Sequence, residues 1–291
     1  MRKGIILAGG KGSRLHPLTF SVTKQLLPVY DKPMIFYPFS VLLQLNVKDI
    51  LIISTEKDQN QFKNLFGNGE NYGVNISYEI QRTPKGIAEG LIIAEEFLAK
   101  DPCVFILGDN LFIGSMEQKR FSDVFFQTEG ATIFTYKVND PERYGVVTVD
   151  KSNKPISIIE KPQNSSSNHA ITGIYFYDNN ACKIAKSIKP SNRNELEITD
   201  VNNVYLKNKI LNVKSLDTNI TWLDAGTIDS LYESSNIVSA IEKRTGKKIA
   251  CLEEIAFLNK NISLDKLKKI SLSYGSSGYG DYLKKIIKSI K

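Results

Sequence analysis

Residues 3–15 read Lys3-Gly4-Ile5-Ile6-Leu7-Ala8-Gly9-Gly10-Lys11-Gly12-Ser13-Arg14-Leu15. The stretch begins with a short apolar run, which is typical of a buried strand. Three glycines follow at once, and glycine lets backbone N–H groups come close enough to cradle phosphate oxygens. We therefore predict a first strand that leads directly into a phosphate-binding loop.

The loop does not match two common phosphate-binding motifs. In a Walker A loop the lysine is followed by serine or threonine, but Lys11 is followed by Gly12. In the dinucleotide-binding fingerprint a third glycine stands where this chain has Leu15. Taken alone, the loop is also compatible with a plain tight turn between a strand and a helix, so its function depends on the residues around it.

The first half of the chain alternates β-rich runs with helix-like runs. These runs are residues 3–8, 35–45, 48–54, 75–79, 88–98 and 103–107. Such alternation is typical of parallel strands joined by helices that cover both faces of the sheet. We expect an α/β fold with a Rossmann-like mixed, mostly parallel sheet flanked by helices.

The second half is first strand-rich and then helical. Apolar runs alternate with turn residues from 131 to 176, which predicts a strand-rich part that extends the sheet. Helices are expected to begin at Thr199-Asp200 and at Thr227, because a capping oxygen precedes an apolar-periodic run there. The pattern breaks after residue 243, which predicts a main domain over 1–243 and a helical C-terminal tail over 244–291.

Composition argues against several classes of function. The net charge is +7, but residues 265–291 hold seven lysines against two aspartates, so the remainder is nearly balanced. A nucleic-acid groove would spread its cations along a binding face with aromatic residues between them, so no nucleic-acid partner is expected. With His16 and His169 as its only histidines, the chain predicts neither a Ser-His-Asp triad nor a histidine-rich zinc site. Any metal should be bound by oxygen.

The sequence predicts a cytoplasmic protein without a membrane partner. The N-terminal apolar run is shorter than a signal sequence or a bilayer span requires, and no later run is long enough. Cys103, Cys182 and Cys251 are widely spaced and form no C-x-x-C pair. They are expected to be reduced core residues.

Two neighbouring motifs, Gly9-Gly10-Lys11-Gly12-Ser13-Arg14-Leu15 and Lys24-Gln25-Leu26-Leu27-Pro28, resemble the signature of the sugar-phosphate nucleotidylyltransferases. The tail, residues 247–291, resembles that of the long form of that family's glucose-1-phosphate thymidylyltransferases through residues 249–257. Further segments that resemble this group are Gly108-Asp109-Asn110, residues 140–147, Glu160-Lys161-Pro162, residues 195–200 and Trp222-Leu223-Asp224.

The resemblance implies an enzyme that transfers a deoxythymidylyl group from dTTP to glucose 1-phosphate. The sugar phosphate would attack the α-phosphorus directly, giving dTDP-glucose and pyrophosphate, the first step towards dTDP-sugars such as dTDP-rhamnose. Mg²⁺ is the implied cofactor, and the long form implies a homotetramer. Two alternatives stay open: a UTP-dependent or other hexose-1-phosphate nucleotidylyltransferase, and an inactive homologue that only binds nucleotide sugars.

The resemblance also assigns roles to residues in the catalytic domain, 1–243. Arg14, Lys24 and Lys161 are the implied catalytic cations, and Asp109 and Asp224 would bind the metal. The nucleotide-binding residues would be Gly9, Gly10, Gly12, Ser13, Arg14, Gln25, Gln81, Pro84, Gly86 and Asp109. The residues around the sugar phosphate would be Asn110, Tyr144, Gly145, Glu160, Lys161, Thr172 and Arg193.

Physical chemistry supports this assignment. Two multiply charged anions must approach each other and the leaving group gains charge, so fixed cations and a metal are the expected catalysts. The resemblance implies that Gln81 contacts a pyrimidine base, and an amide, which can both donate and accept hydrogen bonds, suits the O4 and N3–H edge of thymine or uracil. Two readings stay open for Tyr175 and Trp222: they line the sugar pocket, or they belong to the core. Aromatic residues at strand edges are more often core residues, so neither is counted among the site residues.

Overall fold

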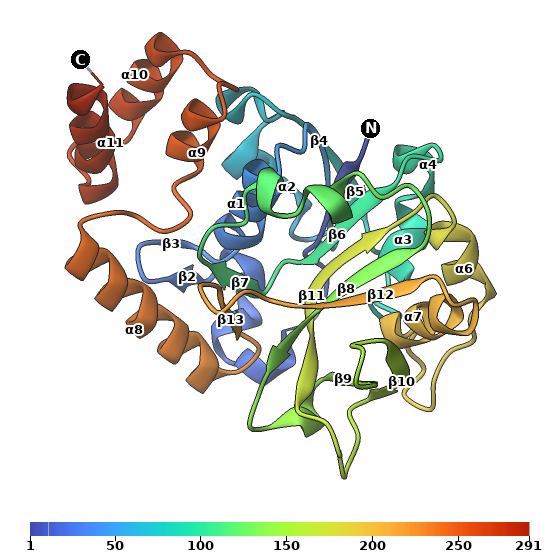
Figure 1. The fold of residues 1–291 in the computed structure, drawn as a ribbon. Coiled ribbons are helices and arrows are strands. Elements are labelled where there is room, and N and C mark those ends of the chain that lie inside the picture. Colours follow the sequence, from blue (N-terminus) through green and yellow to red (C-terminus); the bar gives the residue numbers. More distant parts are fainter. Residues whose placement is uncertain (11, 291) are drawn as a thin grey trace.

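A nine-stranded sheet forms the centre of the molecule (Figure 1). The computed structural model describes residues 1–10 and 12–290, so Lys11 of the glycine loop and Lys291 of the tail lie outside the described residues. The parallel strands lie in the order β6-β1-β4-β5. They are β1 (Lys3–Leu7), β4 (Asp49–Ser54), β5 (Asn75–Ile80) and β6 (Cys103–Leu107).

The strand-rich second part continues this sheet. The long strand β11 (His169–Tyr177) pairs antiparallel with β6, β8 and β9. The strands around it are β8 (Ala131–Lys137), β9 (Gly145–Val149), β10 (Pro155–Glu160) and β12 (Leu211–Ser215). Two small ribbons complete the strands, β2 (Pro28–Val29) with β3 (Lys32–Pro33), and β7 (Asn110–Ile113) with β13 (Thr221–Asp224). The predicted α/β class and mixed sheet are confirmed.

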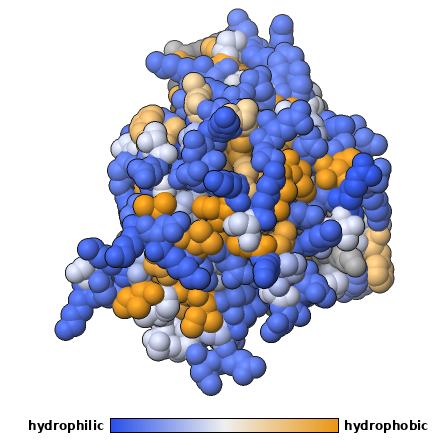
Figure 2. All heavy atoms as spheres, turned by 90° about the vertical axis from the view of Figure 1, so that its right-hand side faces the viewer, coloured by the Kyte–Doolittle hydropathy of each residue, from blue (hydrophilic) through white to orange (hydrophobic). Residues whose placement is uncertain are grey.

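Helices cover both faces of the sheet, and an apolar core lies between the sheet and the helices on each face. One core lies under α1 (Phe36–Gln44), α2 (Gln59–Phe66) and α5 (Ser122–Phe125). The other lies under α3 (Glu89–Ile93), α4 (Glu95–Leu98), α6 (Ala181–Ser187) and α7 (Ile198–Lys207). Seen from the side of this second group, the surface is mostly hydrophilic with an apolar band across it (Figure 2).

The two predicted helix starts have different outcomes. Helix α8 (Ile228–Thr245) begins after Thr227, whose hydroxyl accepts a hydrogen bond from Ser230 N and forms a capping box. Helix α7 begins at Ile198, so the predicted start at Thr199-Asp200 is wrong by about one half-turn. The reason is that the Thr199 hydroxyl does not cap the helix but donates to Glu160 Oε2 at 2.6 Å.

The C-terminal tail is anchored by a buried carboxylate. Its helices are α9 (Leu252–Leu258), α10 (Leu264–Ser273) and α11 (Gly278–Ser289). Glu253 is fully buried, and it accepts hydrogen bonds from the hydroxyls of Tyr274 at 2.6 Å and Tyr279 at 2.7 Å. Because these hydroxyls come from the end of α10 and the start of α11, Glu253 ties the three tail helices together.

Replacing Glu253 with leucine is expected to lower the free energy of unfolding by about 2 kcal/mol or more, since two buried hydroxyls lose their acceptor. Urea unfolding measures this loss. The control is Asp265→Asn, whose exposed carboxylate pairs with Lys268, and it should change the free energy of unfolding by less than about 0.5 kcal/mol. Equal stability of both variants would contradict the anchoring role.

Two further expectations concern the cysteines and the membrane. Cys103, Cys182 and Cys251 are free and buried, as predicted. In the part of the chain that the structure describes, no helix combines the length and the apolar character needed to cross a bilayer.

Candidate functional site

A cleft lies at the carboxyl ends of β1 and β6, where ligands collect in open α/β sheets. It consists of three adjoining hollows, and Arg14 and Asp109 line all of them. We call them the loop hollow, the Gln81 hollow and the Glu160 hollow. The glycine loop follows β1 directly, so the first predicted motif forms part of the cleft wall.

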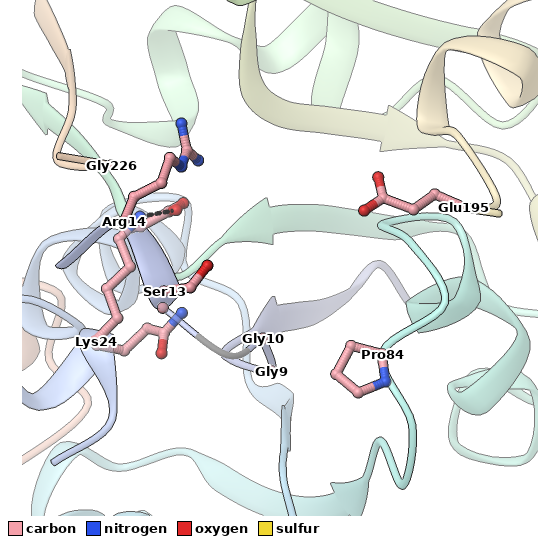
Figure 3. A pocket seen from close by; sticks show the side chains of 11 residues that line it. Gly9, Gly10, Ser13, Arg14, Lys24, Pro84, Glu195 and Gly226 are labelled. Atoms are coloured by element: carbon pink, nitrogen blue, oxygen red, sulfur yellow. Dashed lines mark hydrogen bonds and ion pairs between the residues drawn. The ribbon is translucent and has the colours of Figure 1, made fainter. Parts of the chain in front are cut away.

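The loop hollow, of about 440 Å³, brings together most of the predicted nucleotide-binding residues. Gly10 and Gly12 have φ values of +116° and +58°, a region in which glycine is favoured. Arg14 and Lys24 lie on one side of the hollow and Pro84 and Glu195 on the other (Figure 3). The described lining residues are Gly9, Gly10, Gly12, Ser13, Arg14, Lys24, Gln25, Pro84, Asp109, Glu195 and Gly226.

The Gln81 hollow adjoins it on the side of β5. Gln81 and Gly86, the two remaining predicted nucleotide-binding residues, line it together with Gly9 and Pro84. Gly86 has φ +111°, and a Cβ at this position would lie 2.4 Å from the carbonyl oxygen of Leu196. Only glycine allows this close approach, which brings the backbone of residue 86 to the wall of the hollow.

Lys24 and Asp109 form a partly buried ion pair at the meeting point of the hollows. The ammonium group of Lys24 contacts Asp109 Oδ2, and Asn110 Nδ2 donates to Asp109 Oδ1 at 2.9 Å. Burial opposes ionisation of Asp109, but the charge of Lys24 and these hydrogen bonds outweigh it and hold the pKa of Asp109 below its usual value. Asp109 is therefore kept as a carboxylate.

Strand pairing places Asp224 beside Asp109. In the ribbon of β7 and β13, Asp224 is the register partner of Asn110, and Ala225 N donates to Asp109 O at 3.1 Å. Burial, followed by the negative charge of Asp109, raises the pKa of Asp224 to about 6, although Lys24 and Arg14 oppose the shift. Two mutually repelling carboxylates thus share one corner of the cleft.

This pair of carboxylates fits a hard cation. Carboxylate oxygens are the ligands that Mg²⁺ prefers, and Mg²⁺ commonly takes one or two of them together with substrate phosphates and water. No cluster of three or more His, Cys, Asp or Glu side chains with metal-binding geometry occurs among residues 1–10 and 12–290. Asp109 and Asp224 would therefore hold a metal only together with ligand or water oxygens.

The Glu160 hollow contains most of the residues predicted around the sugar phosphate. Asn110, Tyr144, Gly145, Glu160 and Lys161 line it. Asn110 is buried, and its Oδ1 accepts hydrogen bonds from Trp222 Nε1 at 2.6 Å and Gly173 N at 3.0 Å. These two donors fix the direction of the Asn110 amide.

The Trp222–Asn110 hydrogen bond gives a test of this positioning. Trp222→Phe keeps most of the ring volume but removes the N–H donor. The KM for the sugar phosphate is expected to rise by about three- to tenfold, which corresponds to the net value of one hydrogen bond. Initial-rate measurements at varied sugar phosphate check this, and an unchanged KM would exclude a role of this contact in holding Asn110.

Glu160 links the cations of this part of the cleft. Its Oε2 accepts from Thr199, while its Oε1 lies 3.9 Å from Lys161 Nζ and 3.2 Å from Arg193 Nη2. Arg193 also pairs with Glu197 at 2.8 Å and lines the Gln81 hollow beside Lys161. Lys161 lines both this hollow and the Glu160 hollow, so it lies between the two sides of the cleft.

Thr172 is the predicted residue that the structure does not bring to the cleft. Its side chain is fully buried, and its hydroxyl donates to Phe134 O at 3.1 Å. Its neighbours in β11, Ile171 and Gly173, line the Glu160 hollow instead. Successive strand residues face opposite sides of a sheet, so the side chain of Thr172 points away.

Several lining residues were missed or placed in the core by the sequence analysis. Arg143 lies over the Tyr144 ring at 5.3 Å and approaches Asp224 Oδ2 at 3.9 Å. Arg143 lies inside segment 140–147, which resembles the family, and this resemblance was the sequence feature that could have identified it.

Tyr175 and Trp222 are buried as expected, yet they also line the Glu160 hollow. Other missed residues of the cleft are Gly173, Glu195, Thr199, Asn202 and Gly226.

Comparison with known proteins finds relatives that match nearly the whole chain. A sequence model described as nucleotidyl transferase matches residues 3–240. A glucose-1-phosphate thymidylyltransferase of Neisseria meningitidis is 47% identical over 286 residues, covering 98% of this chain and 99% of its own. One of Xanthomonas campestris pv. campestris is 46% identical, covering 99% of this chain and 97% of its own.

Solved structures agree with these matches. A candidate glucose-1-phosphate thymidylyltransferase from Bacillus anthracis, solved with sucrose, superposes with a TM-score of 0.76 at 41% identity and covers 81% of this chain and 95% of its own. A UDP-glucose pyrophosphorylase with UDP-glucose has a TM-score of 0.74 at 24% identity, covering 84% and 99%. At that identity, the second likeness concerns the fold alone.

Proposed function

The chain belongs to the nucleotidyl transferase family, and from this we propose that it joins dTTP to glucose 1-phosphate, releasing pyrophosphate and dTDP-glucose. The relatives that share 46–47% of its sequence over nearly their full length carry the name of this activity. This product would serve the synthesis of dTDP-sugars such as dTDP-rhamnose.

One observation carries the proposal: Arg14, Lys24, Asp109 and Asp224 meet where the loop hollow joins the Glu160 hollow. A triphosphate in the loop hollow would place its α-phosphate near this junction, and a sugar phosphate in the Glu160 hollow would approach from the other side. Holding two reactants in this way replaces a bimolecular encounter by a positioned reaction.

The proposed reaction is a direct displacement. A phosphate oxygen of glucose 1-phosphate forms a bond to the α-phosphorus of dTTP as the bond to the β-phosphate oxygen breaks, and pyrophosphate leaves with the electron pair. Arg14 would hold the triphosphate and stabilise the leaving group, while Lys24 would lie near the reacting phosphate. Lys161 and Arg193 would hold the phosphate of the sugar and reduce its repulsion from the nucleotide.

We also propose Mg²⁺ as the cofactor, held by Asp109 and Asp224. When bound, it would neutralise phosphate charge as a Lewis acid. The donor set supports this, because both ligands are hard oxygens. The pKa of Asp224 is raised first by burial and then by the negative charge of Asp109, and a cation would compensate that charge. Gln25, Gln81, Pro84 and Gly86 would contact the nucleotide from the opposite wall.

The experiment is to incubate the protein with glucose 1-phosphate, Mg²⁺ and one triphosphate at a time while measuring pyrophosphate. The proposal expects the highest kcat/KM with dTTP. Faster turnover with UTP would favour the uridylyl alternative, and nucleotide-sugar binding without turnover would favour an inactive homologue.

We further propose that residues 244–291 form a tail that takes part in a homotetramer. Large apolar side chains remain exposed on α8 and in the tail, including Tyr232 at 71%, Leu258 at 68% and Leu272 at 72% exposure. Association would remove such apolar surface from water. Light scattering should give a mass four times that of the chain, and a monomer at micromolar concentration would refute the assembly.

A further inference from the structure

A hydrogen bond between Gln81 and Glu89 fixes the direction of an amide in the cleft wall. Gln81 follows β5, and its backbone N–H donates to Ser54 O at 2.8 Å. Its side chain is almost fully buried, and Nε2 donates to Glu89 Oε2 at 2.7 Å. The same carboxylate oxygen accepts from Lys85 N at 2.8 Å, so Glu89 is itself held in place.

The chemistry of Glu89 decides which end of the amide faces it. A carboxylate only accepts hydrogen bonds, so the NH₂ group of Gln81 must point towards Glu89 and its oxygen must point away. That oxygen lies against Gly9, where an added Cβ would be 2.0 Å from Gln81 Oε1. Since Gln81 and Gly9 line the same hollow, the amide presents an acceptor there.

The second hydrogen of the Gln81 NH₂ group also has an acceptor within the protein. Gln81 Nε2 lies 3.5 Å from the carbonyl oxygen of Gly86, in addition to its bond to Glu89. An NH₂ group has two hydrogens, and both have acceptors in the protein. The oxygen is therefore the atom of Gln81 left to read a base.

We infer that Glu89 is a positioning residue that makes Gln81 a fixed hydrogen-bond acceptor, so that the enzyme selects pyrimidines with an N3–H group over cytosine. The inference rests on the proposed function and adds the origin of its base selectivity. Thymine and uracil carry a hydrogen at N3, whereas N3 of cytosine is an acceptor that would face another acceptor. A site whose buried polar group is left unpaired rejects the wrong partner strongly.

Glu89→Gln tests this positioning role with little change in the shape of the side chain. A glutamine amide can donate or accept, so it can pair with either end of Gln81 and permits the Gln81 amide to turn over. The kcat/KM values are measured for dTTP, dUTP and dCTP with glucose 1-phosphate and Mg²⁺. The ratio of dTTP to dCTP is expected to fall about tenfold, mainly through a higher KM for dTTP and a lower KM for dCTP, with kcat for dTTP little changed.

Two comparisons separate this effect from general damage. The ratio of dTTP to dUTP should stay constant, because both bases carry N3–H. Glu96→Gln, an equal change on the exposed face of α4, should leave every ratio as in the wild type. A dTTP to dCTP ratio unchanged in Glu89→Gln, including an equal loss with every triphosphate, would overturn the inference. A wild type that does not turn over dTTP would instead overturn the proposed function.

Discussion

Replacing Asp109 with asparagine is expected to lower kcat by about three powers of ten, at unchanged fold. Removal of one preorganised electrostatic group typically costs two to three powers of ten in kcat. Asp109 combines two such roles, because it is a proposed metal ligand and the partner that holds the buried ammonium of Lys24. Steady-state rates of pyrophosphate release measure the loss, and chelation of Mg²⁺ in the wild type should abolish turnover in the same assay.

A matched control separates this effect from loss of a surface charge. Asp229 lies five positions after Asp224 in the first turn of α8, and its side chain is exposed. Asp229→Asn should keep kcat within about twofold, because Asp229 is not among the residues that line the three hollows. The loss of its contact with the helix dipole should change the stability by only fractions of a kcal/mol. If Asp109→Asn turned over as fast as Asp229→Asn with the same Mg²⁺ dependence, the metal site would not lie at Asp109.

The charges around Asp109 and Asp224 favour a bound cation at this corner of the cleft. Lys24 compensates Asp109, but Asp224 has no cation in comparably close contact, since Arg143 is 3.9 Å away. Burial, followed by the negative charge of Asp109, therefore raises the pKa of Asp224. A bound divalent cation would reduce the repulsion between the two carboxylates, so their closeness favours metal binding.

Local patterns predicted the first strand, its glycine loop and the cap of α8, because the residues that determine each of these features are close in sequence. Asp109 and Asp224 are far apart in sequence, and they were linked only through the family resemblance. Their physical link is the pairing of β7 with β13, a ribbon of four residues on each side. Ribbons this short give little periodic signal.

The remaining misses have the same origin. Thr172 was placed in the site only because the family resemblance implied it, but the alternation of β11 turns its side chain into the core. Thr199 was treated as the cap of a helix, although its side-chain partner is Glu160, at the end of strand β10. The role of Glu89 could not be seen without knowing that the end of β5 brings Gln81 above α3. Side-chain partners across elements depend on tertiary structure, which a single sequence does not give.

Replacing Arg14 with alanine is expected to reduce kcat by about two to three powers of ten while leaving stability unchanged. Its side chain is exposed, and among the described residues no carboxylate lies within ion-pair distance of it, so folding gains little from its charge. It nevertheless lines all three hollows, where it can reach a triphosphate.

Two further variants define what Arg14 supplies. Arg14→Lys keeps the charge but loses the planar fork that matches phosphate, so it should recover only part of the rate. Arg244→Ala, at the exposed end of α8, removes the same charge far along the chain and should behave as the wild type. Full activity of Arg14→Ala at saturating dTTP would mean that Arg14 binds the nucleotide without favouring the transition state, and Lys24 would then have to stabilise the leaving group alone.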